Sequence, residues 1–230
     1  MERAIFVLVH GAWHGGWCWR RVVDRLTARG HRVFAPTLTG LADRSHLLSE
    51  RINLTTHVMD IVNLIRWEEL SNIVLCGHSY SGMVITGVAD RIQQQIASLV
   101  YLDAYVPENG QTLLDIRPLD LPQGLTMPPF PAECFRGNKR DRAWIDEQCT
   151  PHPTACATEP LALTGAHHGI RRKIYIRATN YPAPHFEAAY QTAKADPAWV
   201  THDVPCGHEV MLDMPDLLAD LLEAAARLGG

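Results

Sequence analysis

Short apolar runs alternate with amphipathic stretches along most of the chain. Six runs rich in β-branched residues predict strands, at Ile5–Val9, His31–Pro36, Asn72–Cys76, Ile96–Leu102, Lys173–Ala178 and Ala198–Val204. Apolar residues recur at helical spacing in four further stretches, Trp19–Arg29, Thr55–Trp67, about Tyr80–Ala89, and Pro215 to about Leu228. Strands and helices in alternation are typical of a parallel sheet covered on both faces. We therefore expect an α/β fold with a doubly wound, mostly parallel sheet.

One segment, residues 107–169, breaks this alternation. It holds most of the prolines, including the run Pro128–Pro131, and three of the six cysteines. A stretch of about sixty residues without a clear sheet strand is too long for a simple connecting loop. We interpret it as an inserted, mainly helical cap over the strand ends, with residues 1–106 and 170–230 forming the core. With 230 residues, one compact domain is expected, and the cap is not an independent one.

The composition excludes several classes of protein. Hydrophobic residues make up 47% and charged residues 20% of the chain, which is ordinary for a globular protein and excludes a disordered chain or a coiled coil. The 21 basic residues are balanced by 25 acidic ones and form no basic cluster, so no nucleic-acid partner is expected. No run approaches the roughly 20 apolar residues of a membrane span. The apolar run at Ile5–Val9 is also too short for a secretory signal. We expect a soluble cytoplasmic protein without membrane contact.

The cysteines are scattered and include no C-x-x-C pair, so they predict neither a zinc site nor a redox motif. In the cytoplasm they stay reduced. Pairing among the three cysteines of the cap, Cys134, Cys149 and Cys156, is left open by the sequence.

The strongest chemical signal is the sequence Gly77-His78-Ser79-Tyr80-Ser81, directly after a predicted strand and before a predicted helix. A serine between small residues at a strand-to-helix turn is typical of a nucleophile elbow, which raises the hydroxyl above the sheet. The usual pattern has glycine two residues after the serine. Ser81 at that place is small enough to be tolerated, and Ser79 is the predicted nucleophile.

A second segment supplies what acyl transfer needs next to such a serine. The developing oxyanion requires two backbone N–H donors. One is expected from Tyr80, the residue after the nucleophile, and the other from Ala12, in the loop after the first strand. Gly11 allows that loop to approach closely.

The predicted base is His208, which follows the last strand in Pro205-Cys206-Gly207-His208-Glu209. A strand end can present the imidazole to the serine hydroxyl as a general base. His202, inside that strand, and the pair His167 and His168 at the exit of the cap are weaker candidates.

Together, VLVHGAWHGGWCW, LCGHSYSGMV and CGHEVMLDMPDLLADLL resemble the α/β-hydrolase superfamily, in particular its branch of plant methylesterases and hydroxynitrile lyases with related bacterial esterases. The resemblance covers nearly the whole chain and is weakest in the cap. It implies a cofactor-free enzyme without a metal, often dimeric, that cleaves a small ester beneath a helical cap.

The position of the catalytic acid in this sequence differs from that in the methylesterase and hydroxynitrile lyase branch. The resemblance implies an aspartate after the strand that follows the cap, where this chain has Asn180 and no carboxylate. Asp103, at the end of the strand after the elbow helix, is the preferred acid, because a carboxylate buried there needs a partner such as His208. Asp203 and Asn180 remain the alternatives.

These residues predict a serine hydrolase that cleaves a small carboxylic ester through an acyl-enzyme. Trp13, His14 and Trp17, after the oxyanion loop, are candidates for the substrate pocket, although packing at the sheet edge explains the tryptophans equally well. A lyase or cyclase that uses the same serine and histidine on a specialised metabolite is the alternative. A silent ligand-binding protein is a third reading. The sequence leaves the substrate open, and a homodimer remains possible.

Overall fold

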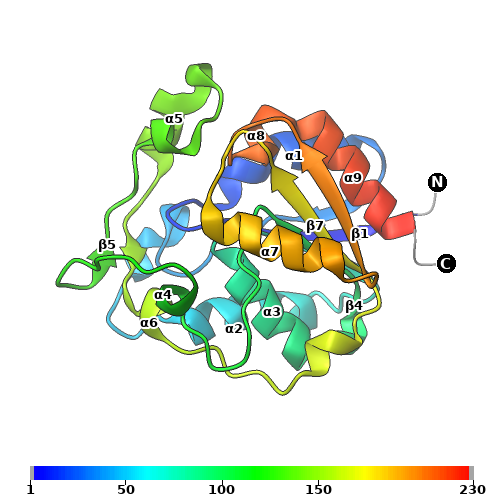
Figure 1. The fold of residues 1–230 in the computed structure, drawn as a ribbon, viewed down its shortest axis with the longest axis horizontal. Coiled ribbons are helices and arrows are strands. Elements are labelled where there is room, and N and C mark those ends of the chain that lie inside the picture. The colour runs from blue at the N-terminus through cyan, green and yellow to red at the C-terminus, as the bar shows by residue number, and fades with distance from the viewer. Residues whose placement is uncertain (1–2, 228–230) are drawn as a thin grey trace.

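A computed structural model describes residues 3–227 and confirms the α/β fold, with a twisted central sheet between layers of helices (Figure 1). The six strands are β1 (Ile5–Val9), β2 (Arg32–Phe34), β3 (Ile73–His78), β4 (Ile96–Leu102), β7 (Lys173–Ala178) and β8 (Trp199–Val204). Their order is β2-β1-β3-β4-β7-β8, and every neighbouring pair is parallel. The strand expected at 31–36 is shorter than predicted, since at this edge of the sheet only three residues pair with β1.

Helices cover both faces of the sheet. They are α1 (Arg20–Ala28), α2 (Leu54–Trp67), α3 (Ser81–Arg91), α7 (Pro184–Ala195), α8 (Val210–Asp213) and α9 (Pro215–Arg227). Within β1, Val7 and Val9 pack toward α2, α3 and α7, whereas Phe6 and Leu8 pack toward α1, α8 and α9. Because both faces of the inner strands are buried, β1, β3 and β4 are apolar at almost every position, whereas β8 at the edge has Thr201, His202 and Asp203. The predicted end of the last helix at Leu228 lies outside the described residues.

Between β4 and β7 the chain leaves the sheet and forms short elements. These are α4 (Leu113–Ile116), β5 (Thr126–Met127), α5 (Arg142–Gln148), β6 (His152–Pro153) and α6 (Ala155–Thr158). Short 3-10 helices fill the cap and other connections, namely η1 (Gly16–Trp19), η2 (Ala42–Leu47), η3 (Gln93–Gln95), η4 (Ala132–Phe135), η5 (Lys139–Asp141) and η6 (Ala166–Gly169). The antiparallel ribbon of β5 and β6 was not expected, because two residues per strand are too few for a periodic pattern.

Hydrogen bonds on several sides fasten this segment to the rest of the molecule. Arg21 of α1 donates two hydrogen bonds to the carboxylate of Asp141, at 2.7 and 2.8 Å. The N–H of Thr150 donates to the carbonyl of Trp13 at 2.9 Å. On the far side, Glu159 accepts hydrogen bonds from Thr55 at the start of α2. Residues 107–169 are thus held against the loops that leave the carboxyl ends of the strands.

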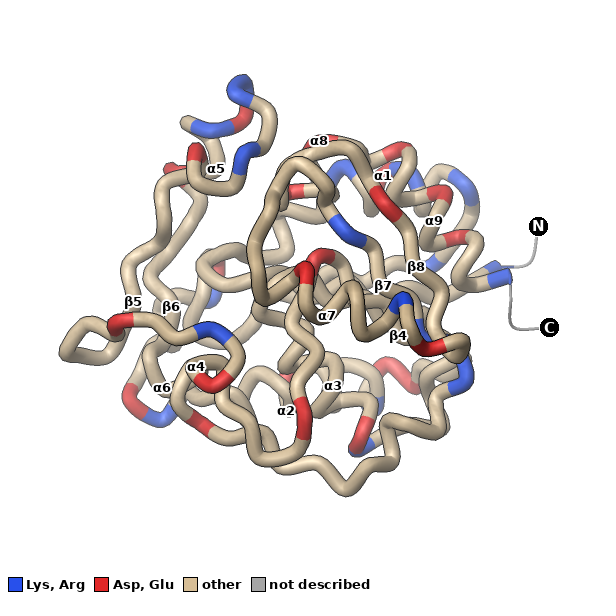
Figure 2. Tube along the Cα trace, viewed as in Figure 1, with Lys and Arg blue, Asp and Glu red and all other residues tan. Residues whose placement is uncertain are grey.

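The described residues show three further properties. All six cysteines are free thiols, with Cys134 exposed and Cys149 half-buried, so none of the cap cysteines is in a disulfide. Within residues 3–227 no helix is both long and apolar enough to cross a bilayer. Figure 2 shows basic and acidic positions interspersed along the trace rather than gathered on one element.

Candidate functional site

The turn between β3 and α3 has the geometry of a nucleophile elbow. Ser79 adopts a left-handed backbone conformation, with φ of 54°, which is uncommon for a residue with a side chain. A Cβ atom on Gly77 would lie 2.7 Å from the carbonyl oxygen of Ser81, and one on Gly82 would lie 1.9 Å from that of Tyr105. Glycine is therefore required on both sides of the turn, and the half-buried serine stands at its apex.

Ser81, at the place where the usual elbow has glycine, makes a contact that glycine cannot make. Its hydroxyl donates a hydrogen bond to the carbonyl of His10 at the end of β1. This bond fastens the elbow to the neighbouring strand. The departure from the usual motif is therefore an anchoring contact in this chain.

The loop after β1 packs directly on the elbow. A Cβ atom on Gly11 would lie 3.0 Å from the Cβ of Ser79 and 2.9 Å from Nδ1 of His78, so only glycine permits this approach. Within residues 3–227, the N–H groups of Ala12 and Tyr80 donate no hydrogen bond. Both groups are thus free to bind an oxygen atom of a ligand.

Asp103 and His208 meet at the carboxyl ends of β4 and β8. Nδ1 of His208 lies 2.6 Å from Oδ2 of Asp103, and the N–H of Ala178 donates to Oδ1 at 3.2 Å. Asp103 is fully buried and has a φ of 42°, so a second strained residue lies at this edge of the sheet. Throughout the described chain, neither the Ser79 hydroxyl nor Nε2 of His208 forms a hydrogen bond.

Burial shifts the pKa values of this pair in opposite directions. It lowers the pKa of His208 to about 4, so the imidazole is neutral near pH 7. Burial also raises the pKa of Asp103 to about 7, against the opposing effect of the Ala178 N–H. Because Nδ1 donates to the carboxylate, the lone pair of the neutral ring is on Nε2.

The other candidates for acid and base have different partners. Asp203 is largely exposed and accepts a hydrogen bond from Arg177 at 2.9 Å. The backbone N–H of Asn180 donates to the carbonyl of Cys206. His202 is half-buried on β8. His167 pairs with Asp90 at 3.0 Å, and the ring of His168 packs against the ring of His167. In this structure Asp103 is the carboxylate that contacts His208.

Two aromatic rings that we did not predict enclose the imidazole of His208. Phe186 of α7 stacks on it with ring centroids 5.1 Å apart, and Tyr181, in the preceding loop, stacks at 4.6 Å. The signal for α7 is present in the sequence, since Phe186, Tyr190 and Ala193 are buried at helical spacing. These rings hold the imidazole in one plane while its nitrogens stay free for polar contacts.

The three residues predicted to line the substrate pocket contact groups other than Ser79 and His208. Trp13 is buried, and its indole N–H donates to the carbonyl of Met127 in the cap at 3.1 Å. His14 pairs with Glu209. Trp17 lines a surface pocket of about 610 Å³ together with Arg20, Thr37, Asp43 and Glu147, and neither Ser79 nor His208 lines that pocket. A role of these three in substrate binding stays a prediction.

One group in the described chain has the residue types of a metal site. Ligand atoms of His57, His152 and Cys156 lie within 4.8 Å of one another, and all three residues are buried. Both nitrogens of His57 are already engaged, at 3.0 Å from the Thr39 carbonyl and 3.0 Å from the Tyr80 hydroxyl. These hydrogen bonds account for the position of His57, whereas Nε2 of His152 has no hydrogen-bond partner among residues 3–227.

The chain is similar to known hydrolases along nearly its whole length. The profile of the alpha/beta hydrolase family matches residues 6–221. A carbendazim hydrolyzing esterase from Nocardioides sp. (strain SG-4G) is 43% identical over an alignment of 239 residues, gaps included. The alignment covers 96% of this chain and 99% of that protein. Methylesterase 10 from Arabidopsis thaliana is 30% identical over an alignment of 250 residues, again with gaps, which covers 96% of this chain and 91% of that protein. The predicted resemblance to plant methylesterases and bacterial esterases is confirmed.

The fold is similar to solved structures to the same extent. An extracellular alpha/beta-hydrolase from a Paenibacillus species superposes with a TM-score of 0.83 at 22% sequence identity, over 97% of this chain and 99% of that one. This likeness concerns the fold alone.

Proposed function

The chain belongs to the alpha/beta hydrolase family, and on this premise we propose that it hydrolyses a small carboxylic ester through a covalent acyl-enzyme. Esterases similar to it over nearly their whole length support this reaction class. The observation that carries the mechanism is the buried 2.6 Å contact between Asp103 and His208, at the same edge of the sheet as the strained Ser79. A nucleophile, a base and an acid on that edge are the parts of a hydrolase triad.

In the first half of the reaction, the Oγ atom of Ser79 attacks the ester carbonyl. Nε2 of the neutral His208 takes the hydroxyl proton, and Asp103 stabilises the imidazolium that forms. Catalytic hydrogen bonds are often long in free enzymes, and we propose that substrate binding brings Oγ and Nε2 into contact. The N–H groups of Ala12 and Tyr80 stabilise the oxyanion.

In the second half, the tetrahedral intermediate collapses and the alcohol leaves with the proton from His208. The acyl group is then bonded to Ser79. A water molecule gives its proton to Nε2 and attacks the acyl carbon, and the second intermediate collapses to the free acid as His208 returns that proton to the Oγ of Ser79. Every group in this sequence belongs to the chain, the substrate or water.

The test is ester turnover in the wild type and in Ser79→Ala. We expect hydrolysis of p-nitrophenyl acetate and butyrate by the wild type, and carbendazim, which the similar esterase is named for, is a third substrate to assay. A fluorophosphonate probe is expected to add one label to the intact wild type, and both signals disappear in Ser79→Ala.

Ser71→Ala is the matched control, because Ser71 is exposed in the loop before β3. It is expected to retain full turnover and labelling. A wild type that neither labels nor turns over esters would contradict the esterase proposal and favour the lyase or cyclase alternative. Labelling that persists in Ser79→Ala would assign the nucleophile to another residue.

A further inference from the structure

Glu209 is a buried carboxylate directly after the proposed base. Its side chain is 1% exposed, and within the described residues its two oxygens accept no aligned hydrogen bond. The nearest basic atom is Nε2 of His14, 3.3 Å from Oε1. A buried carboxylate without hydrogen-bond donors is costly, so Glu209 depends on the charge of that partner.

The contacts of His14 determine its protonation state. Its Nδ1 lies 2.8 Å from the carbonyl oxygen of Ala12, which can only accept, so Nδ1 carries a hydrogen. Its Nε2 lies 3.3 Å from the carboxylate of Glu209 without an aligned hydrogen bond, and an ionised carboxylate also only accepts. A hydrogen on both ring nitrogens, which makes an imidazolium, is the form of His14 that these two acceptors favour.

The surroundings agree with a charged pair. Burial is the largest single influence on the pKa of His14 and lowers it, but Glu209 and the carbonyl of Ala12 together outweigh burial and raise that pKa. Burial is also the largest single influence on the pKa of Glu209 and raises it, but His14, together with His78 and His208, outweighs burial and lowers that pKa to about 2. The indole of Trp17 stacks on the imidazole of His14, with centroids 5.1 Å apart and planes 23° apart, an arrangement that favours a cation.

The two ends of the pair touch two parts of the proposed machinery. The negative end is Glu209, the residue after His208. The carbonyl of His208 in turn accepts a hydrogen bond from Nε2 of His78 in the elbow. The positive end holds the carbonyl of Ala12, the residue proposed to bind the oxyanion. That loop needs support, because Trp13 has a φ of 66°.

In ester hydrolysis, His208 becomes positive while the substrate oxygen at Ala12 becomes negative. The pair has the opposite sequence of charges, with Glu209 adjoining the base and His14 adjoining the oxyanion loop. We propose that Glu209 and His14 form a buried ion pair that positions the oxyanion loop against the base and stabilises the charge separation of the transition state. The inference rests on the proposed function, and both are positioning residues.

Glu209→Gln tests the charge, because glutamine keeps the shape of the side chain. We expect kcat for p-nitrophenyl acetate to fall about tenfold, less than the loss of a direct oxyanion donor, while KM stays within about twofold. His14→Gln is expected to have a similar effect. The loss of kcat in the double variant should be no greater than that in the less active single variant, because either change already removes the same ion pair.

Glu223→Gln is the matched control. Glu223 is also buried and paired with a histidine, His31, but the pair lies between α1 and α9. Its substitution is expected to leave kcat unchanged. Glu209→Gln with kcat within about twofold of the wild type would overturn the catalytic part of the inference, as would additive losses in the double variant.

Nitrogen-15 NMR of the histidine rings separates this inference from the proposed function, since it needs no substrate. We expect the ring of His14 to carry two hydrogens at pH 7.5 in the wild type and one in Glu209→Gln. A singly protonated His14 in the wild type would overturn the ion pair. A wild type without turnover or labelling would overturn the proposed function and the catalytic role of the pair, while the NMR signals would still decide its charge.

Discussion

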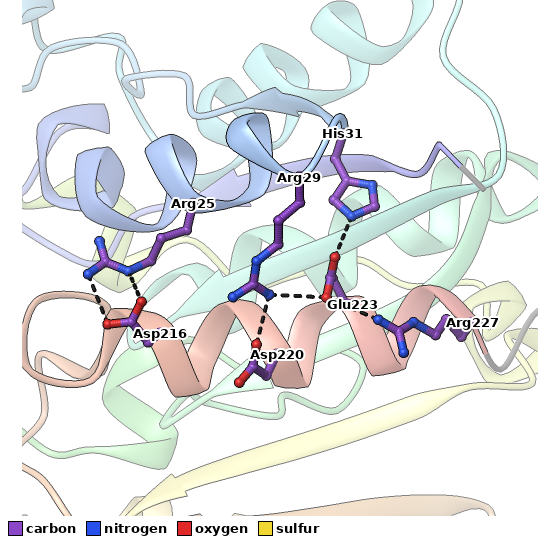
Figure 3. A network of polar contacts seen from close by, with 7 residues as sticks. All are labelled: Arg25, Arg29, His31, Asp216, Asp220, Glu223 and Arg227. Atoms are coloured by element: carbon purple, nitrogen blue, oxygen red, sulfur yellow. Dashed lines mark hydrogen bonds and ion pairs between the residues drawn. The ribbon is translucent and has the colours of Figure 1, made fainter. Parts of the chain in front are cut away.

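Two buried histidines of this molecule contact a carboxylate with nearly the same geometry but in different surroundings. His208 lies 2.6 Å from Asp103 at the carboxyl edge of the sheet, and His31 lies 2.7 Å from Glu223 between α1 and α9 (Figure 3). The second ring nitrogen of His31 accepts a hydrogen bond from the N–H of Ala4, so both of its nitrogens are engaged. The second nitrogen of His208 has no such partner in residues 3–227.

The two carboxylates also differ. Glu223 accepts from Arg29 at 3.0 Å and from Arg227 at 3.1 Å in addition to His31, and Figure 3 shows these groups converging on it. Among residues 3–227, only the Ala178 N–H and His208 donate to Asp103. A histidine beside a carboxylate is therefore not by itself a catalytic pair. What distinguishes the site is a free ring nitrogen and a carboxylate whose charge is not shared among arginines.

The largest expected difference between the pairs concerns the acid. Asp103→Asn removes the charge that, in the proposed mechanism, stabilises the His208 imidazolium, and we expect kcat for p-nitrophenyl acetate to fall about 10⁴-fold with folding intact. Asp203→Asn, at the alternative acid, is the control and should stay within about twofold of the wild type. The reverse pattern would move the acid to the end of β8.

The pH dependence of turnover sharpens the comparison further. Burial lowers the pKa of His208 to about 4, and the base must be unprotonated to act. Burial also raises the pKa of Asp103 to about 7, and a protonated Asp103 no longer stabilises the imidazolium. We therefore expect kcat/KM to be constant above about pH 8 and to fall about tenfold per pH unit below about pH 7, before His208 itself is protonated. Circular dichroism at each pH separates this loss from acid unfolding. A midpoint near pH 4 would mean that Asp103 stays ionised and that protonation of His208 alone limits turnover.

The pair between the helices should affect stability instead of turnover. Glu223→Gln removes the anion that Arg29, Arg227 and His31 share, and we expect the free energy of unfolding to fall by about 2 kcal/mol. Urea unfolding measures the loss, and kcat measured on the folded variant should equal that of the wild type. Lowered turnover per folded molecule would contradict the separation of the two pairs.

The smallest effect is expected at the exposed end of the same network. Arg25 pairs with Asp216, whose side chain is 75% exposed, so water already screens the charges. The melting temperature of Asp216→Asn is expected to equal that of the wild type within experimental error. A clear decrease would show that the network acts as one unit from end to end.

The parts of the fold that could be predicted from the sequence are those in which burial produces a simple pattern of apolar residues. The strands at Ile5–Val9, Ile96–Leu102 and Lys173–Ala178 have the predicted bounds, because strands buried on both faces are continuous apolar runs. Helix α7 was not predicted, since its buried residues alternate with alanines and polar residues that give weak contrast. The two-residue strands of the cap leave no pattern at all.

The candidate site divides in the same way. Ser79, Asp103 and His208 each follow a parallel strand, and the carboxyl ends of such strands share one edge, so sequence order alone brings them near each other. The partnership of His14 with Glu209 had no sequence signal. It depends on how the loops after β1 and β8 fold toward each other, and His14 was predicted to line the pocket instead.

The placement of α9 has a consequence for the order in which the protein is made. Leu218 and Leu222 of this helix pack on the face of the sheet that Phe6 helps to form, and Arg25 and Asp216 are 191 positions apart in the chain. Helix α9 therefore has to leave the ribosome before its part of that apolar face is covered. Until then the nascent chain exposes the apolar residues that α9 covers, and a message truncated before Pro215 would encode a protein prone to aggregate.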